Sequence, residues 1–149
     1  MRILHTADWH LGKHLEGYSR IEEQKVFIEE LVAIADENKV DMILISGDIY
    51  DTFNPSAEAE KLFYQSLKRL SRDRERVIAI ISGNHDSPNR LVAPSPLTLK
   101  QGIIIMDKPG FRIDGEQVGN HEIINRDRGF VELEIKGEKV VLLTLPYPS

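Results

Sequence analysis

The sequence has 149 residues, of which 41% are hydrophobic, with a formal net charge of -5 and no cysteine. This length and composition predict one domain, or a large piece of one, with an ordinary core, and they exclude disulfides and thiolate metal sites. The negative net charge gives no overall attraction to a polyanion. No apolar run forms a secretion signal or reaches the roughly 18 residues of a membrane span, so we expect a cytoplasmic protein without a membrane partner.

Three short apolar runs predict buried parallel strands, because they are continuous rather than alternating. They cover residues 2–6, 42–46 and 77–82, and each ends at a polar motif that contains glycine. A helix is expected after the first run, with a capping box of Ser19 and Glu22 and an apolar stripe of Phe27, Leu31, Ile34 and Ala35. A second helix is expected after the second run, with Asn54 as N-cap, Pro55 as first residue and an apolar face of Ala59, Leu62, Phe63, Leu67 and Leu70.

This alternation is a βαβαβ unit, whose right-handed crossovers bring the ends of the strands to one edge of a sheet. Residues 87–96 are predicted to form a proline-bearing loop, and residues 103–106 a fourth strand. Two antiparallel hairpins are expected after it, one around Asp114-Gly115 within residues 111–118 and one within residues 131–145. The expected fold class is therefore α/β, with helices flanking a parallel sheet and antiparallel hairpins beyond it.

Polar residues follow each predicted strand. Asp8 and His10 follow the first strand, two residues apart in a segment expected to be extended, so that both project from one side and can share an ion. Asp48 and Asp51 follow the second strand, and Gly83, Asn84, His85 and Asp86 follow the third. The first pair alone could be a capped turn and Asp48 alone a helix cap, but open α/β sheets bind their ligands at the carboxyl ends of strands. Together the motifs indicate a ligand site.

Carboxylate, imidazole and amide groups suit manganese, iron or zinc. If two ions lie about 3.5–4 Å apart, as in two-metal hydrolysis of phosphate esters, Asp48 is the natural bridge between them. Asp8 and His10 would then hold one ion and Asn84 the other. His85 would be free to give a proton to the leaving oxygen or to stabilise charge on the phosphate. Asp51 and Asp86 are expected to orient the loops and the imidazoles.

The motifs D-x-H, G-D-x-x-D and G-N-H-D resemble those of the calcineurin-like metallophosphoesterases, and the similarity is strong over residues 1–100. It is greatest to the DNA nucleases of that family, through the stretches 1–24, 47–56 and 82–91. The resemblance implies manganese-dependent exonuclease and endonuclease activity on DNA ends and hairpins in repair and recombination, with two divalent metal ions, a homodimer, an ATPase partner subunit and association with the nucleoid. By position it also gives Asp8, His10, Asp48 and Asn84 to the metals and the catalytic role to His85.

The family completes both metal sites with histidines from later G-H and G-H-x-H segments, and neither segment occurs in this sequence. We therefore expect residues 1–149 to be the N-terminal portion of a nuclease domain, without its C-terminal half, its DNA-capping region and its ATPase-binding segment. Such a chain should bind metal weakly and be close to inactive alone. The alternatives are a phosphatase or cyclic-nucleotide phosphodiesterase on the same scaffold, and a non-catalytic dimerisation or binding module.

Other polar and aromatic residues have simpler interpretations. His5 is expected to be a hydrogen-bonded core histidine, His14 and His121 to lie on the surface, and Trp9 to fix its loop by packing. Tyr50 and Phe53 should wedge the second loop against the core, and the basic cluster at 68–76 should be a solvated helix end at the edge opposite the metals. Phosphate contacts are better sought on the loops of the metal edge, at Lys13, Arg20 and Arg90.

Overall fold

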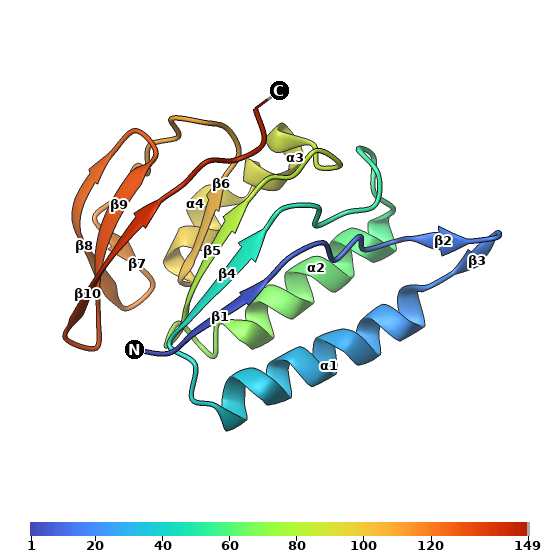
Figure 1. The fold of residues 1–149 in the computed structure, drawn as a ribbon, viewed down its shortest axis with the longest axis horizontal. Coiled ribbons are helices and arrows are strands. Elements are labelled where there is room, and N and C mark those ends of the chain that lie inside the picture. The colour runs from blue at the N-terminus through green and yellow to red at the C-terminus, as the bar shows by residue number, and fades with distance from the viewer. Residues whose placement is uncertain (149) are drawn as a thin grey trace.

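The computed structural model of the protein describes residues 1–148, except for the side chains of Ser95 and Pro96. Helices cover one face of a parallel sheet, and an antiparallel sheet packs against its other face (Figure 1). The parallel sheet has the order β1-β4-β5-β6, with strands Ile3–Thr6 (β1), Met42–Ser46 (β4), Val77–Ile81 (β5) and Ile103–Met106 (β6). The α/β class, the two-sheet core and all four predicted strands of the parallel sheet are confirmed.

The strands β4, β5 and β6 are apolar apart from Ser46, the last residue of β4, because both of their faces are buried. In β4, Ile43 and Ile45 pack with the helices, while Met42 belongs to the core between the two sheets. The edge strand β1 differs, since Ile3 is 50% exposed and His5 is exposed too. His5 was wrongly expected in the core, although its Nε2 does lie 2.8 Å from the Ser46 hydroxyl. β1 is therefore less covered than β6, the strand at the other edge of the sheet, whose four residues are all buried.

The first helix (α1) spans Ile21–Glu37 and begins later than the capping box predicted. Ser19 lies in a two-residue strand, Tyr18–Ser19 (β3), which pairs with His14–Leu15 (β2), and the N-cap Arg20 makes no side-chain capping bond. The apolar stripe was also partly wrong, because Phe27 and Ile34 are 38% and 39% exposed. The buried residues of α1 are Ile21, Ile28, Leu31 and Ala35.

The second helix (α2) spans Ala57–Leu70, and its N-cap is Ser56 rather than Asn54. The Ser56 hydroxyl accepts the backbone N–H of Ala59 at 3.2 Å, which satisfies one of the free donors of the first turn. The expected N-cap was therefore two residues too early. The apolar face of α2 was predicted correctly: Ala59, Leu62, Phe63, Leu67 and Leu70 are all buried.

Residues 87–96, where a loop was expected, contain the short helix Pro88–Val92 (α3) and the start of a second short helix, Ser95–Lys100 (α4). Pro at the first or second position of each helix fits the first turn, which needs no N–H donor there. Leu91 of α3 is 1% exposed and packs in the helix-side core. None of the described helices has both the length and the apolar character needed to cross a membrane.

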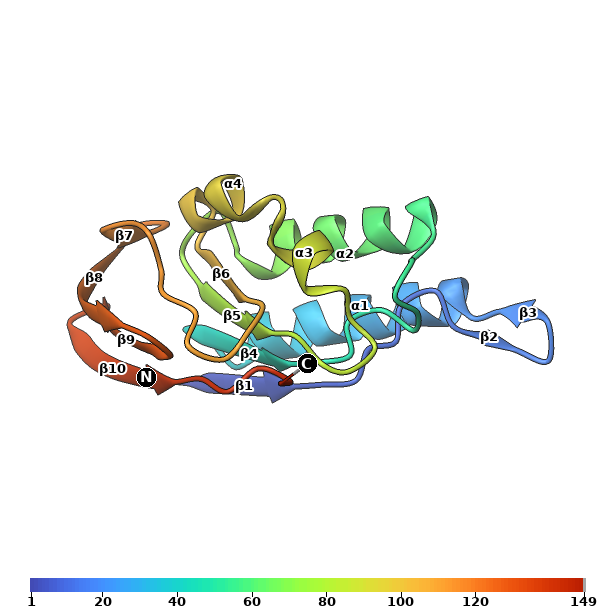
Figure 2. The ribbon, with the colours of Figure 1, turned by 90° about the horizontal axis from the view of Figure 1, so that it is seen from above.

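The antiparallel sheet has the order β10-β9-β8-β7, with strands Gln117–Val118 (β7), His121–Asp127 (β8), Phe130–Ile135 (β9) and Glu138–Leu143 (β10). The hairpin of β9 and β10 confirms the second predicted hairpin. The prediction of a hairpin at Asp114-Gly115 was wrong, because β7 pairs with β8 through a turn at Gly119 and Asn120. Before β7 the chain instead buries Ile113 between the two sheets. Figure 2 shows this sheet at one end of the molecule and the β2–β3 hairpin at the other.

The edge opposite the carboxyl ends of the strands contains the basic cluster, as expected, but Arg76 there is buried and 1% exposed. Its guanidinium donates to the Val40 carbonyl at 2.8 Å and to the Asp36 carboxylate at 2.6 Å, and it reaches the Leu70 carbonyl at the end of α2. His121 is buried as well, with Nε2 3.0 Å from the Glu75 carbonyl, so its assignment to the surface was wrong. This edge is a structural junction of α1, α2 and β8.

Candidate metal centre

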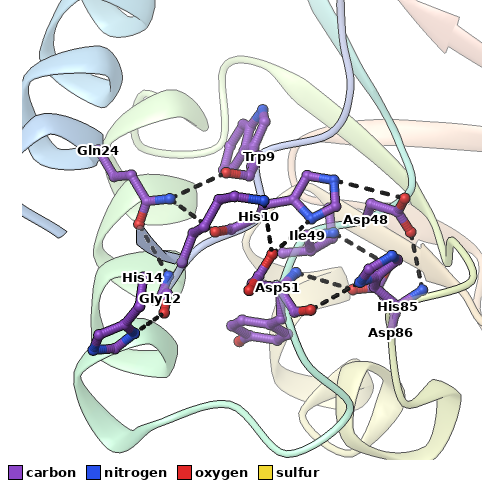
Figure 3. Close-up of polar contacts among 12 residues, drawn as sticks. Trp9, His10, Gly12, His14, Gln24, Asp48, Ile49, Asp51, His85 and Asp86 are labelled. Atoms are coloured by element: carbon purple, nitrogen blue, oxygen red, sulfur yellow. Dashed lines mark hydrogen bonds and ion pairs between the residues drawn. The ribbon is translucent and has the colours of Figure 1, made fainter. Parts of the chain in front are cut away.

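The segments that follow β1 and β4 run side by side beyond the sheet. The backbone N–H of Asp8 donates to the Gly47 carbonyl at 3.1 Å, and that of His10 donates to the Asp48 carbonyl at 2.9 Å. Leu11 continues the pairing with a bridge to Tyr50. Because the two segments are joined by backbone hydrogen bonds, the side chains of Asp8, His10 and Asp48 are held at one place (Figure 3 draws His10 and Asp48).

Three of these residues have left-handed backbone conformations: φ is 56° at Asp8, 46° at His10 and 50° at Asp48. Such values are uncommon for residues other than glycine, and the surrounding structure must hold them in place. The segment of Asp8 and His10 is therefore not extended, and the reason given for their shared direction was wrong. The two side chains nevertheless meet, because ligand atoms of Asp8, His10 and Asp48 all lie within 4.8 Å of one another.

The glycines that precede Asp48 and Asn84 allow their two loops to touch. A β-carbon on Gly83 would lie 2.1 Å from Asp48 Oδ1, and one on Gly47, whose φ is 79°, would lie 2.9 Å from the Gly83 α-carbon. No side chain fits at either position without displacing the other loop. The exposed Asn84 follows directly on Gly83, so this residue belongs to the loop that contacts Asp48.

Asp86 joins the loops after β4 and β5 and is 2% exposed. Its carboxylate accepts three backbone N–H groups, from Ile49 at 3.2 Å, Tyr50 at 3.1 Å and Gly83 at 2.8 Å. These hydrogen bonds satisfy a charge that would otherwise be costly to bury. Asp86 thus holds Gly83 and the following residues against the segment that carries Asp48.

Asp51 lies on the other side of the His10 imidazole from Asp48. Asp51 Oδ1 is 3.2 Å from His10 Nδ1, and Asp48 Oδ2 is 3.8 Å from His10 Nε2. His10 Nδ1 is buried, and its contact with Asp51 lacks the alignment of a hydrogen bond. The imidazole therefore stands between two carboxylates with one nitrogen directed to each.

His85 contacts both of these carboxylate residues. Its backbone N–H donates to Asp48 Oδ1 at 3.0 Å, and its Nδ1 lies 2.8 Å from the Asp51 carbonyl oxygen. The hydrogen bond to that carbonyl and the charges of Asp48, Asp51 and Asp86 raise the pKa of the exposed His85 imidazole above its usual value. The His10 and His85 rings meet edge to face at 4.9 Å between centroids. His85 is thus a protonatable group beside the cluster of carboxylates.

The described donors fit a divalent cation. Two overlapping groups have ligand atoms within 4.8 Å of one another: Asp8, His10 and Asp48, and His10, Asp51 and His85. Carboxylate oxygens and imidazole nitrogens suit borderline divalent metals. His10 Nε2 faces Asp48 of the first group at 3.8 Å, and the buried Nδ1, which has no hydrogen bond, faces Asp51 of the second group. The first group is the set that the sequence assigned to one ion, with Asp48 shared.

The three cations predicted to contact phosphate are all paired with carboxylates. Lys13 Nζ lies 3.5 Å from Asp51 Oδ1, Arg90 lies 3.0 Å from Glu60, and Arg20 pairs with Glu23. A cavity of about 340 Å³ beside α1 is lined by Thr6, Ala7, Asp8, Trp9, Lys13, Arg20, Glu23, Gln24 and Phe27. The structure therefore brings Lys13 and Arg20 to the side of Asp8, whereas Arg90 lies on α3 and pairs with α2.

Aromatic residues fix the loops around this cluster. Trp9 is 5% exposed, donates to the Thr6 hydroxyl at 2.9 Å, and meets Phe63 edge to face, which confirms its packing role. Tyr50 is 3% exposed, as expected, but Phe53 is 58% exposed and does not wedge the second loop. His14 is exposed, as predicted.

One residue of the site was missed. Gln24 of α1 reaches the segment of His10 with its side-chain amide, as Figure 3 shows. The sequence contains a signal for it, because Gln24 occupies the stripe of Ile21, Ile28 and Leu31 on α1. A polar residue at a core-facing position needs a hydrogen-bonding partner.

Comparison with known proteins agrees with this geometry. Residues 1–144 match the family described as calcineurin-like phosphoesterase. The chain belongs to the calcineurin-like phosphoesterase family, and membership in this family implies binding of divalent metal ions.

Two relatives make the similarity more specific. The chain is 46% identical over all 149 residues to the SbcD component of the nuclease SbcCD from Bacillus subtilis. It is 40% identical over 129 residues, 86% of the chain, to the same component of SbcCD from Rhodobacter capsulatus. The chain spans about a third of the length of these curated relatives, 34% and 32%.

Proposed function

We propose that this chain is the N-terminal part of the catalytic domain of a metal-dependent DNA nuclease that hydrolyses phosphodiesters with two divalent ions. The observation that carries the proposal is the convergence of Asp8, His10 and Asp48 within 4.8 Å at the carboxyl ends of neighbouring parallel strands. Family membership and the two nuclease relatives support the same reaction class.

Asp8 and His10 would hold one ion, Asn84 the other, and Asp48 both. Bound divalent ions supply Lewis-acid activation of the phosphodiester and of the attacking water. The contribution of the chain is to hold these ligands rigidly through the paired segments after β1 and β4. Asp51 orients the His10 imidazole from its Nδ1 side, at 3.2 Å.

His85 would act on the substrate rather than as a ligand. Its Nδ1 is engaged by the Asp51 carbonyl, which leaves Nε2 directed away from that bond. The hydrogen bond to the Asp51 carbonyl, and after it the nearby carboxylates, raise the pKa of this imidazole. It would therefore stabilise charge on the phosphate and donate a proton to the leaving oxygen.

The proposed substrates and partners are based on the two nuclease relatives described above. We propose Mn²⁺ as the ion, DNA ends and hairpins as substrates, a homodimer, and the SbcC ATPase as the other component of the complex that the relatives' name describes. Lys13, Arg20 and Arg90 would contact phosphates in exchange for their present carboxylate partners. If one of these residues contacts a phosphate, reversal of its charge should lower the slope of the logarithm of the DNA-binding constant against the logarithm of salt concentration by about one. Reversal of Lys139 on β10 should leave that slope unchanged.

Residues 1–149 alone are proposed to bind metal weakly and to cleave DNA poorly. The histidine-bearing G-H and G-H-x-H segments by which the family completes its two sites are absent from these residues. Robust cleavage by the pure 149-residue chain would show that the ligand set is wrong.

The decisive experiment combines Mn²⁺ titration by calorimetry with a nuclease assay on the complete protein that carries this sequence. Asp48→Asn should abolish cleavage and weaken Mn²⁺ binding by about a hundredfold, because it replaces the shared carboxylate by a neutral amide. Asp73→Asn, in an exposed turn at the opposite edge, is the matched control. Hydrolysis of small phosphate esters without DNA cleavage would favour a phosphatase, and unchanged function in Asp48→Asn would favour a non-catalytic module.

A further inference from the structure

We infer that Gln24 is a positioning residue of the metal centre, which fixes the backbone of His10 and thereby the affinity of the site for its ion. The inference rests on the proposed metal-dependent function and concerns a residue that none of the motifs contains. Gln24 lies in the first turns of α1, partly buried, and its amide faces the segment that follows β1.

The Gln24 amide uses both of its hydrogen-bonding groups on that segment. Its Nε2 donates to the His10 carbonyl at 2.8 Å and, more weakly, to the Trp9 carbonyl at 3.4 Å. Its Oε1 accepts the Gly12 N–H at 2.9 Å. One side chain thus brackets His10 from both sides, which neither a shorter amide nor a carboxylate can do, since only a glutamine combines this reach with a donor and an acceptor.

The segment around His10 has a backbone conformation that requires hydrogen bonds from outside it. His10 and Asp8 have φ of 46° and 56°, and Gly12 has φ of 87°, so the chain turns through left-handed conformations at alternate residues. Left-handed conformations of residues with a β-carbon cost of order 1 kcal/mol each and persist only where neighbouring contacts define them. The hydrogen bonds of Gln24 are contacts of that kind, and they come from an element outside the segment.

The helix that carries Gln24 is itself firmly placed. Ile21 and Ile28, on the same stripe as Gln24, are 6% and 2% exposed and belong to the core that also contains Trp9 and Leu11. A displacement of the His10 backbone would turn its imidazole away from Asp48, to which Nε2 now lies at 3.8 Å. Gln24 therefore transmits the rigidity of α1 to a proposed ligand without touching the ion.

The test is a Mn²⁺ titration of the complete protein that carries this sequence, at a temperature where circular dichroism shows each variant folded. Gln24→Met conserves volume and removes all of these hydrogen bonds, so the Mn²⁺ affinity should fall by about tenfold or more. Gln24→Asn has a side chain one methylene shorter, so its amide cannot reach the same partners and the Mn²⁺ affinity should fall as well. This variant takes the place of Gln24→Met if Gln24→Met does not fold. The matched control is Gln65→Met, an exposed glutamine on α2, which should leave the affinity unchanged.

Asp48→Asn in the same titration tests the metal centre separately from the role of Gln24. If Asp48→Asn binds Mn²⁺ weakly but Gln24→Met stays within about twofold of the parent, the role of Gln24 is overturned and the metal centre stands. If Asp48→Asn itself stays within about twofold, the metal centre is overturned together with the role of Gln24. Weakened binding in both, with Gln65→Met unchanged, supports the inference.

Discussion

Gly83 lies so close to Asp48 that a β-carbon on residue 83 would stand 2.1 Å from the Asp48 carboxylate. The contact joins the loop that carries Asn84 and His85 to the loop that carries Asp48. The conformation of Gly83 lies outside the left-handed region, so its requirement for glycine is one of space.

We predict that Gly83→Ala displaces Asp48 and destabilises the protein by about 1–3 kcal/mol, the usual cost of overpacking. Mn²⁺ affinity should fall as well, because the displaced atom is a proposed ligand. Urea unfolding and calorimetry measure the two effects. Gly115→Ala is the control, since its β-carbon would meet only the flexible end of the Leu99 side chain. Equal behaviour of the two variants would contradict the steric argument.

Asp86→Asn should destabilise the protein by about 2–3 kcal/mol in urea unfolding, because a buried carboxylate that accepts three backbone N–H groups is replaced by an amide. One of those donors would face the NH₂ group of the new side chain. Asp127→Asn, exposed on β8, should change the free energy of unfolding by less than about 0.5 kcal/mol. An equally small change for Asp86→Asn would show that its hydrogen bonds contribute little.

His85→Asn should lower the cleavage rate of the complete protein by about 10²–10⁴-fold while leaving Mn²⁺ affinity near that of the parent, because we assign His85 to proton transfer and not to metal binding. Single-turnover cleavage and calorimetry measure the two quantities. His14→Asn, exposed on β2, is the control. A large loss of metal affinity in His85→Asn would instead make His85 a ligand, as its grouping with His10 and Asp51 also allows.

Asp41 should make folding stability depend on pH. The hydrogen bond from Lys136 at 2.9 Å, followed by that from the Arg2 N–H, holds the pKa of Asp41 below its usual value. A lowered pKa in the folded state means that the stabilisation is present above the unfolded-state pKa of about 4 and is lost as pH falls through the folded-state pKa.

Lys136→Met should therefore reduce the free energy of unfolding at pH 7 by up to about 1 kcal/mol. The difference from the parent should shrink at pH 3, because the stabilisation of the ionised Asp41 is progressively lost below its unfolded-state pKa. Urea unfolding at the two pH values measures it. Lys139→Met, exposed on β10, should show no such pH-dependent difference. A difference that grows at low pH would have the wrong sign for this mechanism.

Arg76→Met should destabilise the protein by about 3–5 kcal/mol, because it removes a buried guanidinium that joins Val40, Leu70 and Asp36. Mn²⁺ affinity at a temperature where the variant is folded should not change, since Arg76 lies at the edge opposite the proposed metal centre. Arg74→Met, exposed in the same turn, is the control. Loss of metal affinity would show coupling between the two edges.

The sequence alone determined the strands and helices of the βαβαβ unit, the parallel sheet, and the edge of it at which the proposed site lies. The continuous apolar runs of β4, β5 and β6 are readable because both faces of these strands are buried. The edge strand β1 and the two-residue β7 were harder to read correctly, since edge position and pairing depend on residues far away in the chain. The helix starts were missed by one or two residues because several capping residues compete locally and tertiary packing selects among them.

Within the proposed site, the sequence determined that Asp8, His10 and Asp48 come together, because right-handed crossovers bring the carboxyl ends of parallel strands to one edge. Only the tertiary structure decided how they gather: through left-handed turns at Asp8, His10 and Asp48, through the contact of Gly83 with Asp48, and through the amide of Gln24. Periodicity describes regular elements, whereas these features are made by loops from different elements that hold one another in conformations neither would adopt alone.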